Sequence, residues 1–165
     1  MRRIFMLVMA VPLVLVGYAA PASATVVPQH VSVTLDATGT GPVVSTGAIN
    51  DTGTFTTLSL RQSGRSHTSH GTFRIDFTAG SYSGKFTAID TSQTFDAATC
   101  TATITGKGID VINKKLGTGD YAGLKGHGHF TYVETIIGVA TVDDCDMSAP
   151  TVSNQIEGDG VVKLP

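Results

Sequence analysis

The chain has 165 residues with a formal net charge of −2, and 41% of its residues are hydrophobic. A length of this order fits a single domain with a short leader. Without Arg2 and Arg3 the formal charge is about −4, and a negative charge argues against a nucleic-acid partner. Outside the first residues, Lys114-Lys115 is the only adjacent basic pair, and we interpret it as a solvated turn.

The N-terminal residues have the three parts of a secretory signal peptide. Arg2 and Arg3 form a positive start, residues 4–16 are apolar, and residues 22–24 form an Ala-Ser-Ala cleavage site. The apolar stretch is shorter than the ~20 residues that a membrane-spanning helix needs. We therefore predict a signal peptide over residues 1–24 with cleavage after its last residue. A retained membrane anchor is the alternative.

Residues 25–165 are therefore expected to form one domain of a secreted protein, extracellular or periplasmic, with no membrane anchor after cleavage. Both cysteines, Cys100 and Cys145, lie in this part. An even number of cysteines in an oxidising compartment favours a disulfide over two free thiols. Neither a Cys-x-x-Cys redox motif nor the paired spacing of a zinc site is present. We therefore predict a Cys100–Cys145 disulfide.

Alternation of apolar and polar residues, rather than a helical period, runs through this domain. The clearest example is residues 71–77, where Phe73, Ile75 and Phe77 share one face. Candidate strands recur about every 8 to 12 residues, which is the spacing of an all-β sandwich or barrel. In chain order they are residues 30–35, 43–49, 54–60, 71–77, 82–90, 100–106, 108–112, 126–134, 138–143 and 154–162. The predicted core consists of Phe73, Ile75, Phe77, Phe86, Ile104, Phe130 and Tyr132.

Polar and glycine-rich segments separate the candidate strands. The longest of them, residues 62–70, contains His67 and His70, and we interpret it as a loop that covers one mouth of a barrel. Asn50 begins an Asn-Asp-Thr glycosylation acceptor, which matters only in a eukaryotic secretory host. The predicted turns are residues 36–41, 50–53, 62–70, 79–81, 113–120 and 144–150.

A glycine-rich run over residues 117–130 is the most distinctive local feature, with the sequence Gly-Thr-Gly-Asp-Tyr-Ala-Gly-Leu-Lys-Gly-His-Gly-His-Phe. Glycine suits the tight turns and close backbone approaches that closing a small barrel requires. The run resembles the Gly-Thr-Gly-x-Tyr-x-x-hydrophobic-x-Gly-x-Gly-x-Phe signature of allene oxide cyclase-like and dirigent-like barrels. The resemblance covers these residues and, in outline, the order of the flanking strands.

This resemblance implies an all-β fold, an eight-stranded antiparallel up-and-down barrel of the calycin-like type with a lumen. The family includes plant cyclases that bind a reactive oxylipin, dirigent proteins that steer phenoxy radical coupling, and bacterial barrels that fold a polyketide chain for cyclisation. All of them act chiefly by binding and shaping a molecule. Because members with different activities share the signature, it assigns no catalytic residue in this chain.

The strand predicted over residues 126–134 carries the candidate site. Its alternation places Phe130, Tyr132 and Glu134 on one face. If that face lines the lumen, Glu134 has a raised pKa and is a candidate acid, base or ligand anchor. Glu134 is therefore the candidate catalytic residue, and Phe130, Tyr132, Glu134 and Tyr82 are the candidate ligand contacts. The alternative leaves Glu134 solvated or ion-paired at the rim and the aromatic residues in the core or in turns.

Two clusters contain side chains that bind metals but lack the other features of a metal site. His127 and His129 share the other face of the same strand, and such a pair can chelate zinc or copper. No third ligand is fixed beside them, so we interpret them as exposed. The acidic residues within 143–146 lack EF-hand spacing and are interpreted as a hydrated loop. We expect no metal site.

Standard motifs of catalysis and of cofactor binding are missing, including Gly-x-Ser-x-Gly, His-Glu-x-x-His and the phosphate-binding loop. We expect no cofactor. Three hypotheses remain: a secreted barrel that binds a small apolar or amphipathic ligand or a surface partner, a cofactor-free cyclase or isomerase of the allene oxide cyclase type, and a structural or surface-interaction barrel with a filled core. An eight-stranded barrel is wide enough for any of them.

Overall fold

The computed structural model describes residues 25–63, 67–141 and 144–165, so the predicted leader over 1–24 lies outside the described residues. The described residues form strands and turns, and no helix among them is long and apolar enough to cross a membrane. The strands are β1 (Val26–Asp36), β2 (Thr40–Gly47), β3 (Asp51–Ser63), β4 (Thr68–Phe77), β5 (Gly80–Asp96), β6 (Thr101–Ile112), β7 (Thr118–Gly119), β8 (Lys125–Ala140) and β9 (Cys145–Lys163).

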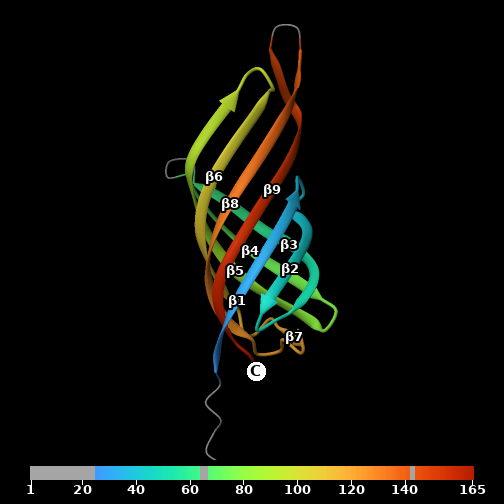
Figure 1. Cartoon of the computed structure of the whole chain (residues 1–165), viewed down its shortest axis with the longest axis vertical. Coiled ribbons are helices and arrows are strands. Elements are labelled where there is room, and N and C mark those ends of the chain that lie inside the picture. Colours follow the sequence, from blue (N-terminus) through green and yellow to red (C-terminus); the bar gives the residue numbers. More distant parts are fainter. Residues whose placement is uncertain (1–24, 64–66, 142–143) are drawn as a thin grey trace, which may run out of the picture.

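Eight of these strands form one closed ring (Figure 1). Their order is β4-β3-β2-β1-β9-β8-β6-β5, and the β4–β5 pairing closes the ring. Each pairing within the ring is antiparallel. Apart from β7, each strand pairs with the next one along the chain, and the last strand, β9, pairs with the first, β1. The short strand β7 pairs only with the start of β5, outside the ring. The predicted all-β architecture is therefore confirmed, with eight strands in the ring.

Several strands are longer than predicted. β6 runs without a break where two strands, 100–106 and 108–112, were predicted, and β8 likewise joins two predicted strands. Glycine does not interrupt β6, because Gly106 and Gly108 face the rings of Tyr132 and Phe130 on β8. The predicted turn over 144–150 is also wrong, since β9 begins at Cys145 and pairs with the end of β8.

The predicted rim loop over residues 62–70 is wrong as well. β3 continues to Ser63 and β4 begins at Thr68, while residues 64–66 lie outside the described part. His70 pairs with Arg61 within the sheet and is exposed, and its Nδ1 lies 3.0 Å from Oγ1 of Thr87. The sheet continues through this polar segment because the neighbouring strands supply hydrogen-bond partners for its backbone.

One end of the ring is closed by side chains. The connection between β6 and β8, which includes β7, lies across the lower end of the ring in Figure 1. From this connection Leu124 is fully buried, and the ring of Tyr121 packs on Phe77 and Tyr82 with centroids 5.5 and 6.2 Å apart. This packing, with Phe73 and Ile75 of β4 nearby in the same cluster, forms the hydrophobic core.

The prediction of the core is correct in part. Four of the expected residues are buried: Phe73, Ile75, Phe77 and Tyr132. Phe86, Ile104 and Phe130 point inward but are only half-buried, because they line a cavity.

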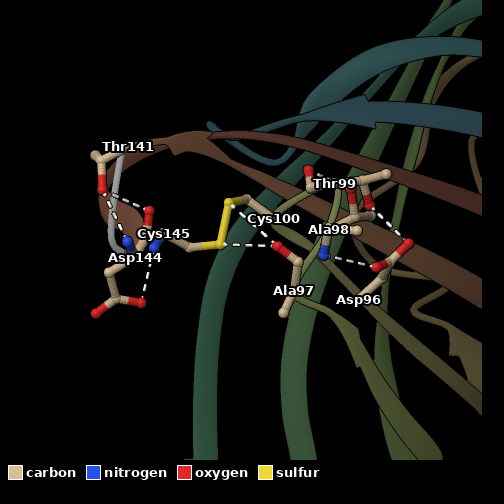
Figure 2. Close-up of a disulfide and its surroundings, with 9 residues drawn as sticks. Asp96, Ala97, Ala98, Thr99, Cys100, Thr141, Asp144 and Cys145 are labelled. Carbon is tan, nitrogen blue, oxygen red and sulfur yellow. Dashed lines mark hydrogen bonds between the residues drawn. A yellow bond between two sulfur atoms is a disulfide. The ribbon is translucent and has the colours of Figure 1, made fainter.

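The predicted disulfide between Cys100 and Cys145 is confirmed, with a Cα–Cα distance of 5.4 Å. Figure 2 shows how it joins the turn between β5 and β6 to the start of β9. Beside it, Asp96 accepts hydrogen bonds from the backbone N–H of Ala98 and the hydroxyl of Thr99, and these bonds lower the pKa of Asp96. A disulfide is consistent with an oxidising environment.

Candidate ligand cavity

The interior of the ring contains a cavity of about 590 Å³. Its size falls in the range of small-molecule sites. Inward-facing residues of β1, β3, β4, β5, β6, β8 and β9 form its wall. Most of the wall is apolar, and it includes Phe55, Phe73, Phe86, Ile104, Phe130 and Ile156.

The cavity opens at the end of the ring opposite the packed connection. There its wall includes the exposed residues Ala37 and Thr38 of the β1–β2 turn. Leu58 and Leu60 of β3 also belong to this rim and are 56% and 61% exposed. Leu58 occupies the irregularity at which the pairing of β3 with β4 shifts register. Solvent-exposed leucines at the mouth give an apolar approach to the interior.

Pairs of an aromatic residue and a glycine shape the wall. A Cβ atom on Gly106 would lie 2.3 Å from the ring of Tyr132, and one on Gly108 would lie 2.2 Å from the ring of Phe130. Each glycine lies directly opposite its aromatic partner, on β6 and β8. The rings therefore lean across β6 toward β5, where Phe130 makes an edge contact with Phe86 at 6.3 Å. A residue larger than glycine at position 106 or 108 would leave no room for these rings.

This lean carries the Tyr132 hydroxyl across β6 to Asp90 on β5, to which it donates a hydrogen bond. Asp90 pairs with Gly106, and Gly106 pairs with Tyr132, so the three lie in one row across the sheet. Burial, the hydrogen bond and the charge of Asp90 raise the pKa of Tyr132. The tyrosine is therefore a neutral hydrogen-bond donor at physiological pH.

Glu134 lies next along β8 on the same inner face. Burial raises its pKa, and the negative charge of Asp90 raises it further. Among the described residues Glu134 has no hydrogen-bond partner. Opposite it on β9 stands Asn154, whose side-chain oxygen is buried and is likewise without a partner among the described residues. Asp90, Glu134 and Asn154 thus present unused acceptor atoms on neighbouring rows of the cavity wall.

A further carboxylate, Asp110 on β6, lies closer to the packed end and also lines the cavity. It lies opposite Gly128, where a Cβ atom would be 2.7 Å from its Oδ1. Burial raises the pKa of Asp110, and the histidines at 127 and 129 oppose that shift. The phenol of Tyr82 also has a raised pKa, first because it is buried and then because of the charge of Asp110.

The structure places all four candidate ligand contacts, Phe130, Tyr132, Glu134 and Tyr82, on the cavity wall. The alternative of a fully solvated Glu134 at the rim is not what the structure has, because the side chain is half-buried. Sequence reasoning missed Asp90, Asp110 and Asn154. A signal for the first was present, because Asp90 alternates in phase with Tyr82 on β5.

The two histidines of β8, His127 and His129, are exposed. In the part of the chain that the structure describes, no group of three or more His, Cys, Asp or Glu side chains is arranged to hold a metal ion. Asp143, one member of the predicted acidic loop, lies outside that part, and Asp144 and Asp146 are exposed.

Comparison of the chain with models of protein families, with curated proteins and with solved structures found no match. The resemblance to allene oxide cyclase-like and dirigent-like barrels therefore stays a prediction.

Proposed function

We propose that this chain is a secreted, calycin-like up-and-down barrel that binds a small apolar or amphipathic molecule in its lumen. The observation that carries the proposal is the cavity of about 590 Å³ with an apolar wall and few polar groups. Phe130, Tyr132, Glu134 and Tyr82 are the proposed contacts. A cavity of this size weighs against the hypothesis of a barrel with a filled core.

The test is titration of the purified protein with N-phenyl-1-naphthylamine, an uncharged probe that fluoresces in apolar surroundings. We expect saturable binding. Ala88, 6% exposed, lies on the cavity wall, and Ala88→Trp should fill the space and abolish binding while the far-ultraviolet circular dichroism is unchanged. Ala140→Trp on the exposed end of β8 is the matched control. Ile104→Trp repeats the test from β6. A wild-type protein that binds no probe contradicts the proposal.

A second candidate is a cofactor-free cyclase or isomerase of the allene oxide cyclase type. The observation that favours it is Glu134, whose raised pKa suits a general acid or base, beside the hydroxyl of Tyr132 within an apolar cavity. A reactive unsaturated epoxide is the substrate class that the resemblance implies. The chain should turn it into a cyclic product with an enantiomeric excess, and Glu134→Gln should abolish that excess while probe affinity stays the same. A racemic product from the wild type would exclude this activity.

A further inference from the structure

The charges of the cavity are of one sign. Its deep polar residues include Asp90, Asp110 and Glu134. Every Lys and Arg in the described part of the chain is exposed, and none belongs to the wall. His127, the one basic residue that reaches the wall, is exposed on β8. Among the described residues, a ligand that enters this cavity therefore meets carboxylates and no Lys or Arg.

The acceptors at the level of Glu134 exceed the donors. The donors there are the hydroxyl of Tyr132, which Asp90 already accepts, and the side-chain N–H groups of Asn154. Glu134 and the side-chain oxygen of Asn154 receive no hydrogen bond from the described residues, and that oxygen is buried. A buried acceptor without a donor costs free energy, and a ligand that brings donors recovers it.

We infer that the cavity takes an amphipathic cation, an apolar body that ends in a protonated amine, with the amine between Glu134, Asp90 and Asn154. This inference rests on the proposed function and deepens it, because it names the class of ligand. An ammonium group has three donors and no acceptor, so it matches a site of acceptors. Charge-assisted bonds to carboxylates away from bulk water are among the stronger polar interactions in proteins.

The same groups select against anions. A fatty acid or another carboxylate would bring a third negative charge beside Asp90 and Glu134, and the described wall holds no Arg or Lys to pair with it. A neutral alcohol would make the apolar contacts with Phe86 and Phe130 and at most one donor bond. The order of affinity is therefore amine first, alcohol second and carboxylate last.

Competition with the bound N-phenyl-1-naphthylamine tests this order, using decylamine, decanol and decanoate below their aggregation concentrations at neutral pH. The three share one alkyl chain, so differences in affinity report the head group. We expect decylamine to bind about tenfold tighter than decanol, the ratio of one charge-assisted hydrogen bond, and decanoate to bind weakest.

Glu134→Gln should lower the affinity for decylamine about tenfold and change that for decanol far less, because the Gln oxygen still accepts the single hydrogen bond of an alcohol. Glu157→Gln is the matched control, because Glu157 lies on the outer side of β9, exposed and paired with His30. That variant should leave all three affinities unchanged, which separates a contact in the cavity from a change of net charge.

The outcomes separate this inference from the proposed function. If the probe and decanol bind but decylamine shows no preference, or if decanoate binds best, the cavity binds apolar molecules and the inference about its ligand class is overturned. An equal loss of decylamine affinity in both glutamate variants also overturns it. If neither the probe nor any decyl compound binds the folded wild type, the proposed function fails as well.

Discussion

The two ends of the ring are built on different principles. At the closed end, Leu124 is fully buried and the rings of Phe77, Tyr82 and Tyr121 fill the interior. In the open half, Asp90, Glu134 and Asn154 surround unfilled space. The same ring of strands encloses both. The difference shows that side-chain volume, not strand number, decides whether such a ring is filled.

The two ends also differ in how far their buried polar groups are hydrogen-bonded. Near the closed end, the side-chain N–H groups of Gln29 donate to Ser45 Oγ at 2.7 Å and to the carbonyl of Thr46 at 2.8 Å. Its side-chain oxygen accepts from the N–H of Ile49 at 2.8 Å. This amide is satisfied on both sides, whereas the side-chain oxygen of Asn154 in the open half is not. Satisfied polar groups hold a structure together, and unsatisfied ones are available to a ligand.

The largest expected effect concerns the open end, which the disulfide stabilises in place of a packed core. Replacing both Cys100 and Cys145 by Ser removes a cross-link between residues 45 positions apart. We expect a loss of up to about 4 kcal/mol in the free energy of unfolding, measured by urea denaturation. The wild type in a reducing agent should unfold at the same urea concentration as the variant. An unchanged midpoint in both would show that packing alone holds this end.

Leu124→Ala tests the packing of the closed end. Leu124 is fully buried within the hydrophobic core, so the variant should lose about 3 kcal/mol of stability. Leu116→Ala, in the same connection but 54% exposed, is the matched control and should change stability by less than about 0.5 kcal/mol. Equal urea midpoints for the two variants would contradict the account of a packed closed end.

Gly106→Ala tests how the wall of the cavity is formed. The added Cβ would collide with the ring of Tyr132, so we expect a loss of about 1 to 3 kcal/mol in urea unfolding. In a Tyr132→Ala background the same substitution should cost less, because the collision is gone. Gly158→Ala is the control, since its nearest neighbour would be Cβ of Phe130 at an ordinary 3.5 Å. Additive costs in the double variant would disprove the steric coupling.

The smallest effect concerns Glu134 and depends on pH. Its pKa is raised in the folded state, so the folded protein binds the proton more tightly than the unfolded chain does. The stability of the wild type therefore falls as pH rises through the ordinary carboxyl pKa to the raised one, and the penalty is fully present above it. Glu134→Gln removes this penalty.

We expect Glu134→Gln to raise Tm by about 1 to 3 °C at neutral pH, a small effect because the side chain is half-buried. The difference should vanish in acid, below the ordinary pKa of a carboxyl group, where Glu134 is protonated in both states. Thermal unfolding followed by circular dichroism at several pH values measures it, with Glu157→Gln as the control. A variant that is less stable than the wild type at neutral pH would mean that Glu134 is ion-paired, contrary to the structure.

Much of the fold follows from alternation, a local property of the chain. It predicted an all-β domain, and it placed Phe130, Tyr132 and Glu134 on one face of one strand. Strand boundaries were less accurate at the glycines of β6 and over residues 62–70. Glycine and polar residues are ordinary signals of turns, but here neighbouring strands complete their hydrogen bonds and fill the space above the glycines.

The sequence by itself determined the all-β class, the disulfide and which residues of β8 share a face, because alternation and the number of cysteines can be read from the chain alone. Only the tertiary structure decided that this face encloses a cavity and brings Tyr132 to Asp90, 42 residues apart in the chain. The volume inside a closed ring depends on which side chains face each other across strands distant in sequence. A local pattern predicts which residues of a strand share a face. Closure of the ring decides which side chains that face contacts.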